Sequence, residues 1–202
     1  MIKFIRWNAL ELYTAISIIF LMIAGITGSP SFTQKIVLLY TVLFVFHEWE
    51  EGRYPGGFID KVVSKVTGLH ASEELHRASR IPTGILLLTF SLTPYLFDNQ
   101  PVFLLVAMNL CIFEGIVHIL AIRVANLGVP YSPGMITAEL ELILGIYVYV
   151  RFANLNVLSA ANVLLGIALF IACFICMQRS LLAMMGKGYG DILRARKAHH
   201  TK

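Results

Sequence analysis

The feature that most constrains this chain is a series of six apolar segments separated by short polar stretches. Each segment runs for roughly 17–25 residues, the length that an α-helix needs to cross a hydrocarbon core about 30 Å thick. Hydrophobic residues make up 57% of the 202-residue chain and charged residues only 14%, which excludes an ordinary soluble domain. We therefore expect an all-α, polytopic transmembrane helical bundle.

The limits of the expected spans follow from the glycine, proline and polar residues between the apolar runs. The six spans run over about 10–27, 35–52, 81–97, 102–124, 134–150 and 157–177. Residues 53–80 interleave charged and apolar side chains, which predicts an amphipathic segment lying in the membrane interface between the second and third spans. We expect one transmembrane domain over residues 1–180 and a basic cytoplasmic tail over residues 181–202.

Lysine and arginine are distributed unevenly around these spans. If the N-terminus is cytoplasmic, all of them except Lys35 and Arg151, fourteen of the sixteen, fall in inside segments. The positive-inside rule then predicts an integral membrane protein with both termini cytoplasmic, and we expect it in a bacterial inner membrane. Anionic lipid head groups account for the net charge of +4. Membrane lipid is therefore the expected partner, and no nucleic acid is needed.

The second expected span carries the sequence His47-Glu48-Trp49-Glu50-Glu51 near its end. At about 100° per residue, His47, Glu50 and Glu51 share one helical face, whereas Glu48 and Trp49 point elsewhere. An ionised side chain at the centre of a membrane helix costs roughly 2.5–3.5 kcal/mol, so such groups are usually paired or bound to a ligand. The motif therefore predicts a functional site.

The expected topology brings more ionisable groups to the same half of the membrane. Glu114 and His118 lie at i, i+4 on one face of the fourth span, and Glu141 follows early in the fifth. Mixed imidazole and carboxylate ligands suit one or two divalent ions, zinc or iron. The alternative is a proton-sharing polar network that fixes helix packing. The predicted metal ligands are His47, Glu51, His118 and Glu141, and the predicted catalytic residues are Glu50 and Glu114.

Three further residues are predicted to bind substrate. Thr137 lies one helical turn before Glu141, and Tyr131 precedes the fifth span. Arg123 can neutralise a carboxylate or bind a lipid phosphate, or it can simply extend its charge to the interface. A second HxxEE sequence begins at residue 70 and is either a second site or a solvated interfacial face. This candidate second site consists of His70, Glu73, Glu74 and His76.

These residues together resemble a known family. The match rests on His47-Glu48-Trp49-Glu50-Glu51, on the glycine pair after Pro55, on His118 in a later helix, and on Tyr131-x-Pro133-Gly134-x-x-Thr137. In this ordered set the chain resembles the HXXEE family of polytopic membrane proteins. The resemblance implies a membrane protein with a polar site, and it implies no particular reaction.

Three classes of function are compatible with such a site. The first is a metal-dependent membrane enzyme, in which a bound ion activates water for hydrolysis of a lipid-like or hydrophobic substrate from the cytoplasmic half of the bilayer. A di-iron oxidoreductase with the same ligands is the alternative within that class. The second class is a proton or divalent-ion transporter, although the outer half of the bundle offers no continuous polar path. The third is a non-enzymatic module in which the polar residues only support packing.

Overall fold

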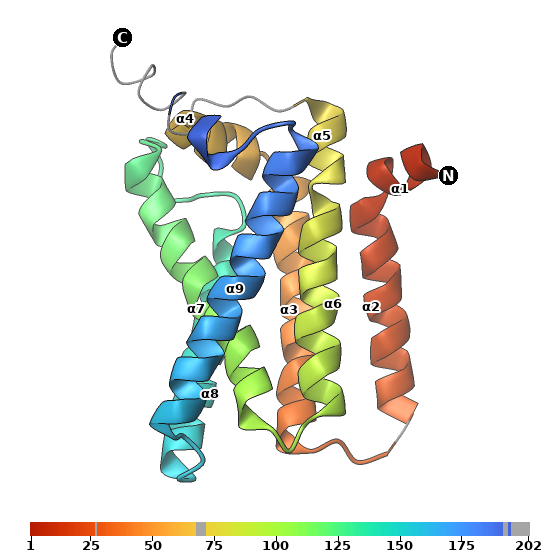
Figure 1. Ribbon diagram of the computed structural model, residues 1–202, viewed down its shortest axis with the longest axis vertical. Helices are drawn as coiled ribbons and strands as arrows, with labels where there is room; N and C mark the ends of the chain where they lie inside the picture. Colours follow the sequence, from red (N-terminus) through yellow and green to blue (C-terminus); the bar gives the residue numbers. More distant parts are fainter. Residues whose placement is uncertain (27, 68–71, 192–193, 195–202) are drawn as a thin grey trace.

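The computed structural model describes residues 1–26, 28–67, 72–191 and 194, and every regular element within those residues is helical. Six long helices run along the molecule, and shorter helices gather at the end where α3 finishes and α6 begins (Figure 1). The long helices are α2 (Ala9–Ile26), α3 (Phe32–Gly52), α6 (Arg80–Leu96), α7 (Pro101–Val124), α8 (Met135–Asn154) and α9 (Ala160–Met184). The short ones are α1 (Ile2–Trp7), the π-helix η1 (Ile59–Val63), α4 (Ser64–Thr67) and α5 (Glu73–Ala78).

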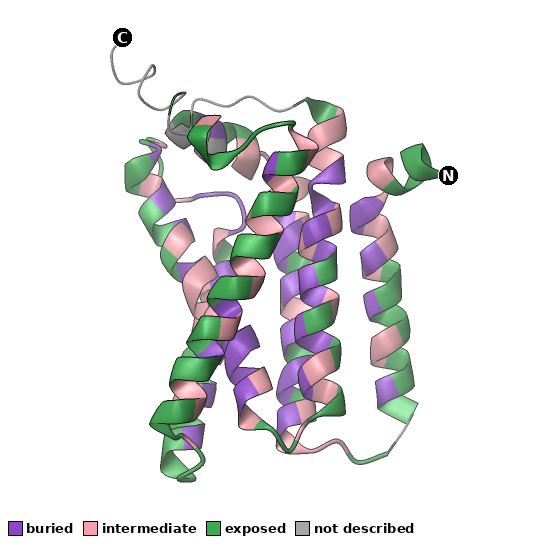
Figure 2. Cartoon of the chain, in the orientation of Figure 1, coloured by how far each residue is buried: buried purple, intermediate pink, exposed green. Residues whose placement is uncertain are grey.

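The bundle is built around α3 and α7. Helix α7 packs most extensively against α8 and then against α9, while α3 packs against α8 and α6, and α2 covers α6 and α3. Buried residues follow the inward faces of α3 and α6, whereas much of α2 and α9 is exposed (Figure 2). Fully buried side chains of Tyr40, Leu87, Leu104 and Met108 form part of the core that holds these helices together.

Three helices are long and apolar enough to cross a membrane, consistent with a membrane protein: α2, α7 and α9. The other long helices are more polar or shorter. Helix α3 carries Lys35 and the glutamates of the His47 motif, α8 carries Glu139, Glu141 and Arg151, and α6 has 17 residues. The six expected segments thus fold as six long helices, and α9 continues to Met184, beyond residue 180.

The segment expected to lie in the interface does not fold as one continuous helix. Its described parts form η1, α4 and α5, and residues 68–71 lie outside the described residues. Arg80, which falls at the end of this segment in the sequence, is the first residue of α6 and is buried. It therefore belongs to the bundle interior instead of the interface.

Local signals mark where α3 and α8 begin. Ser31 and Gln34 form a capping box that begins α3. Gly134 is the N-cap of α8 with φ of +91°, a conformation that glycine adopts without strain. Helix α8 starts beside the end of α3, where the backbone N–H groups of Ile136 and Thr137 donate to Glu50.

Candidate metal centre

Four ionisable side chains from two helices converge inside the bundle, at the end where α3 finishes and α6 begins. His47 and Glu51 come from α3, one turn apart, and Glu114 and His118 come from α7, also one turn apart. Glu51 Oε1 lies 3.7 Å from His47 Nε2 and 3.2 Å from His118 Nε2. Glu114 Oε2 lies 3.9 Å from each of these two nitrogens. We call His47, Glu51, Glu114 and His118 the four-residue cluster.

The second ring nitrogen of each histidine is already held by the protein. His47 Nδ1 lies 3.1 Å from the carbonyl oxygen of Gly134, which can only accept a hydrogen bond. His118 Nδ1 lies 3.0 Å from Ser132 Oγ, and that hydroxyl donates its own hydrogen to the His118 carbonyl at 3.1 Å. Both Nδ1 atoms must therefore be the donors. In each neutral ring the lone pair is left on Nε2, the atom that faces the carboxylates.

The spacing of these atoms is compatible with a shared cation. An ion bound tetrahedrally at about 2.1 Å from its ligands separates the donor atoms by about 3.4 Å. The four nitrogen–oxygen distances lie between 3.2 and 3.9 Å, and three of them exceed hydrogen-bonding reach. His118 Nε2 is buried and forms no hydrogen bond with any described residue. His47, Glu51 and His118 could thus hold a metal ion.

Around the cluster, buried carboxyl groups outnumber cationic side chains. Arg80 donates to Glu48 Oε2 at 2.5 Å and to Glu51 Oε2 at 3.2 Å, so one guanidinium serves two carboxylates. Tyr13 and Thr83 each donate to Glu48 Oε2 at 3.2 Å. With Glu114 ionised, three carboxylates face one arginine, and burial of such an imbalance is costly. A divalent ion would offset the two remaining negative charges.

Glu48 lies on the face of α3 that the helical spacing predicts, but it has an unexpected partner there. The helical spacing directs it away from His47, and its carboxylate is indeed separate from the histidines. It is nevertheless buried, and it shares Arg80 with Glu51. Helix α6 packs against α3 and so places the guanidinium of Arg80 on that face. The spacing of residues along α3 alone cannot predict this contact.

Gly134 allows the backbone to approach the cluster closely. A Cβ atom at this position would lie 2.6 Å from Glu51 Cγ and 2.7 Å from His118 Cε1. Both distances are shorter than ordinary carbon contacts, so only glycine fits. The close approach lets the Gly134 carbonyl reach His47 and orient its ring.

Glu50 lies beside the cluster and serves a different purpose. Its carboxylate accepts hydrogen bonds from Tyr131 at 2.9 Å, from the backbone of Ile136 at 3.2 Å, and from the backbone and hydroxyl of Thr137 at 2.9 and 2.6 Å. These donors surround the N-terminus of α8, where a carboxylate is favourable. Burial and this hydrogen bond to Glu50 raise the pKa of Tyr131 to about 12. Two predicted substrate-binding residues, Tyr131 and Thr137, therefore bind Glu50, which the structure uses to anchor α8.

Other predicted residues lie apart from the cluster. Glu141 is fully buried, its oxygens make no hydrogen bond with the described residues, and it lies outside the group of ligand atoms. Arg123 is exposed near the end of α7. The predicted second site does not converge in its described part: Glu73 pairs with Arg77, Glu74 with Arg6, and His76 with Asp60. His70 lies outside the described residues.

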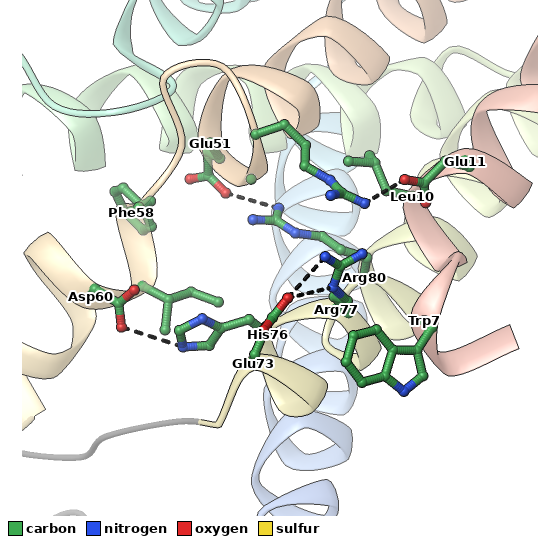
Figure 3. Close-up of a pocket in the computed structure, with 14 residues that line it drawn as sticks. Trp7, Leu10, Glu11, Glu51, Phe58, Asp60, Glu73, His76, Arg77 and Arg80 are labelled. Atoms are coloured by element: carbon green, nitrogen blue, oxygen red, sulfur yellow. Dashed lines mark hydrogen bonds and ion pairs between the residues drawn. The ribbon is translucent and has the colours of Figure 1, made fainter. Parts of the chain in front are cut away.

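A polar cavity of about 180 Å³ reaches the cluster from the end of the bundle (Figure 3). Glu51 and Arg80 line its inner part, and Glu11, Asp60, His76 and Arg77 line the rest. Phe58 also lines it, and the Phe58 ring lies 4.7 Å from the ring of His118. This cavity gives water and ions a route to Glu51, with Phe58 beside His118.

A larger cavity of about 770 Å³ lies between α2, α3 and the start of α8. Its walls are mostly apolar, and its polar end holds Glu50, Tyr131 and Thr137. No member of the four-residue cluster lines it. The predicted substrate-binding residues Tyr131 and Thr137 thus border an apolar cavity, whereas the ligands border the polar one.

Four residues of this centre were not predicted from the sequence to belong to the site. Arg80 was considered only in the distribution of positive charge and in the expected interfacial segment, Gly134 only in the resemblance and as the start of a span, and Ser132 was not singled out. Phe58 lies in the segment expected to be interfacial. One signal was available for Gly134, which is a specified residue of the Tyr131-x-Pro133-Gly134-x-x-Thr137 stretch that carries the resemblance, whereas Ser132 is an unspecified position of that stretch.

Comparisons with known proteins agree with this location of the site. The model of the HXXEE family, described as a protein of unknown function with an HXXEE motif, matches residues 38–150. That range contains all of the four-residue cluster and ends within α8. Neither curated proteins nor solved structures give a match. Because the family model covers more than half of the chain, the protein belongs to the HXXEE family.

Proposed function

We propose that the protein is a membrane-embedded, metal-dependent hydrolase whose six long helices span the bilayer with the cluster in the cytoplasmic half. One observation carries this proposal: the Nε2 lone pairs of His47 and His118 both point toward Glu51 in a buried site. The Nδ1 atom of each ring is held there by a hydrogen-bond acceptor of the protein. Two histidines and one glutamate are a ligand set of catalytic zinc sites, which keep one position open. The protein would thus hold one ion through His47, Glu51 and His118.

The chain also supplies a carboxylate that can act as a base. When bound, the ion would lower the pKa of a coordinated water toward about 7. Glu114 Oε2 lies 3.9 Å from both Nε2 atoms and accepts no hydrogen bond from the described residues, so it is free to take the proton of that water. Glu50 already accepts four hydrogen bonds. Of the two predicted bases, Glu114 is the better placed.

The size of the centre supports hydrolysis over di-iron chemistry. Within the described residues, one group of His and Glu side chains offers ligand atoms within reach of one another, and it suits one ion. Di-iron carboxylate bundles use a glutamate from each of two helices and a Glu-x-x-His pair from each of two others. Glu141 would have to join for a second ion, and it lies outside the ligand group.

The location of the centre in a bundle with apolar, membrane-span-like helices supports a hydrophobic substrate that presents its scissile bond at the cytoplasmic interface. The polar cavity opens at the end of the bundle and reaches Glu51 and Arg80. Arg80 holds Glu51 in place, and Phe58 covers one side of His118. Water can enter there while the surrounding helices keep the rest of the centre dry. An ester, amide or phosphoester of a lipid-like molecule would meet the ion from this side.

The test is hydrolysis by purified, zinc-loaded protein in detergent. The probes are long-chain nitrophenyl esters, a nitroanilide and a nitrophenyl phosphodiester, assayed for the wild type, Glu114→Gln and Glu50→Gln. We expect turnover that requires metal, a loss of about 10²–10⁴-fold in Glu114→Gln with zinc retained, and most of the activity kept in Glu50→Gln. No metal-dependent turnover of any probe, or full activity in Glu114→Gln, would contradict the proposal.

A further inference from the structure

The apolar cavity is a candidate for a ligand of its own. Its volume of about 770 Å³ falls in the range of roughly 300–1,000 Å³ that is usual for small-molecule sites. Ile18, Phe46 and Tyr54 line it and are at least half exposed, so it opens at the surface between α2 and α3. In a membrane that surface faces hydrocarbon, so a ligand can enter from the bilayer.

Among the described residues, Ser17 is a lining residue of this cavity whose hydroxyl has no hydrogen-bond partner. Ser17 lines the cavity from the middle of α2 and is 1% exposed, and its hydroxyl forms no hydrogen bond with any described residue. The nearby Thr14 hydroxyl, in contrast, donates to the Leu10 carbonyl and accepts from Trp49 Nε1 at 3.0 Å. A buried hydroxyl without a partner is costly. A ligand oxygen beside Ser17 would satisfy it.

The other polar groups of the cavity define the charge of that ligand. No lysine, arginine or histidine is among the described residues that line it, so nothing there would pair with an anion. Glu50 is the one carboxylate, and Tyr131, Ile136 and Thr137 already donate to it. A cationic ligand would have to displace these donors. The cavity therefore suits an uncharged molecule.

We propose that this cavity binds the hydrocarbon chain of an uncharged lipid-like molecule, whose ester or ether oxygen accepts a hydrogen bond from Ser17. The site is separate from the four-residue cluster, and the binding does not depend on the proposed hydrolysis. Its polar end meets Thr137, whose hydroxyl lies 3.2 Å from His47 Nδ1. The ligand thus contacts Thr137, which lies beside the Nδ1 atom of His47.

Quenching of Trp49 fluorescence tests the proposal directly, because Trp49 lines the cavity. The measurement uses a Trp7→Phe variant, since Trp7 is the only other tryptophan of the sequence. The probes are a dibrominated octadecanoyl methyl ester, the corresponding free acid at pH 8 and a dibrominated alkane. We expect saturable quenching by the ester and much weaker quenching by the anionic acid. Quenching that does not saturate, or equal binding of ester and acid, would overturn the proposal.

Variants locate the chain within the cavity. Val45→Phe and Leu21→Phe fill the cavity and should each weaken ester binding at least several-fold, whereas the matched control Ile19→Phe faces outward from α2 and should not. Ser17→Ala should weaken ester binding about five-fold, as expected for one hydrogen bond, and leave alkane binding unchanged. Equal effects of Val45→Phe, Leu21→Phe and Ile19→Phe would contradict the assignment. Ester quenching should persist in His118→Ala, so failure of hydrolysis and failure of this site remain distinguishable.

Discussion

Ser132 and His118 hold each other through two hydrogen bonds. The imidazole Nδ1 donates to the Ser132 hydroxyl at 3.0 Å, and the same hydroxyl donates to the His118 carbonyl at 3.1 Å. Because a hydroxyl has one hydrogen, this arrangement fixes both the ring orientation and the nitrogen that carries its proton. Ser132 lies in the loop before α8, so the loop and α7 together determine where His118 Nε2 points.

Ser132→Ala should therefore weaken metal binding about 10–100-fold, the usual effect of removing the partner of a metal-binding histidine. The measurement is zinc affinity by competition with a coloured chelator. Ser180→Ala is the matched control, since Ser180 also donates to a backbone carbonyl, that of Cys176, but lies on exposed α9. Unchanged zinc affinity in Ser132→Ala would contradict this role.

Gly134→Ala should damage the centre more than a comparable change elsewhere. Gly134 and Gly128 both have positive φ, of +91° and +74°, so both alanine variants carry the same kind of backbone strain. Only at Gly134 does the added Cβ meet Glu51, His118 and His47, whereas nothing lies within 4 Å of a Cβ at Gly128. We expect Gly134→Ala to unfold with about 1–3 kcal/mol less stability than Gly128→Ala and to lose zinc. Thermal unfolding in detergent, with and without zinc, measures this, and equal behaviour of the two variants would refute the close approach.

Arg80→Gln should be far more destabilising than Arg77→Gln. Arg80 is buried and pairs with Glu48 and Glu51, and removing one member of a buried ion pair costs about 3–5 kcal/mol. Arg77 pairs with Glu73 one turn away at a more exposed position, and such pairs contribute at most about 1 kcal/mol. Denaturant unfolding followed by circular dichroism gives both values. Similar losses in the two variants would show that Arg80 does not support Glu51 as described.

Phe58→Ala should speed the exchange of bound metal without abolishing binding. Phe58 lines the polar cavity and lies against His118, but it supplies no ligand atom. Removing the ring should widen the route between the cavity and the cluster. The rate of zinc removal by excess chelator should rise several-fold, while Phe97→Ala, which removes a ring that packs on Phe103, should have no effect on it. Unchanged release in Phe58→Ala would place the route elsewhere.

The helices and the centre of the site were predictable because they depend on patterns local in sequence. Apolar segments between glycine, proline and polar stretches placed five of the six long helices to within four residues at each end, whereas α9 ends seven residues later than predicted. Spacing within one helix paired His47 with Glu51 and Glu114 with His118, and the alternation of helix direction placed these pairs at the same end. These conclusions need only helix geometry and chain order.

What surrounds the site could not be read in the same way, because it depends on contacts between distant segments. Arg80 reaches Glu48 and Glu51 only because α6 packs against α3. The separation of Glu50 from Glu51 arises because the N-terminus of α8 binds Glu50. A helical wheel gives both residues the same face and cannot show which neighbour each will meet.

The most direct test of the metal centre is the metal content of the purified protein. Wild type, His47→Ala and His118→Ala, prepared in detergent from cells supplied with zinc and iron, are analysed by mass spectrometry, with His76→Ala from the polar cavity as the control. We expect about one metal ion per wild-type and His76→Ala chain, and almost none in the other two variants. A folded wild type without metal, or retention of metal by His47→Ala and His118→Ala, would contradict it.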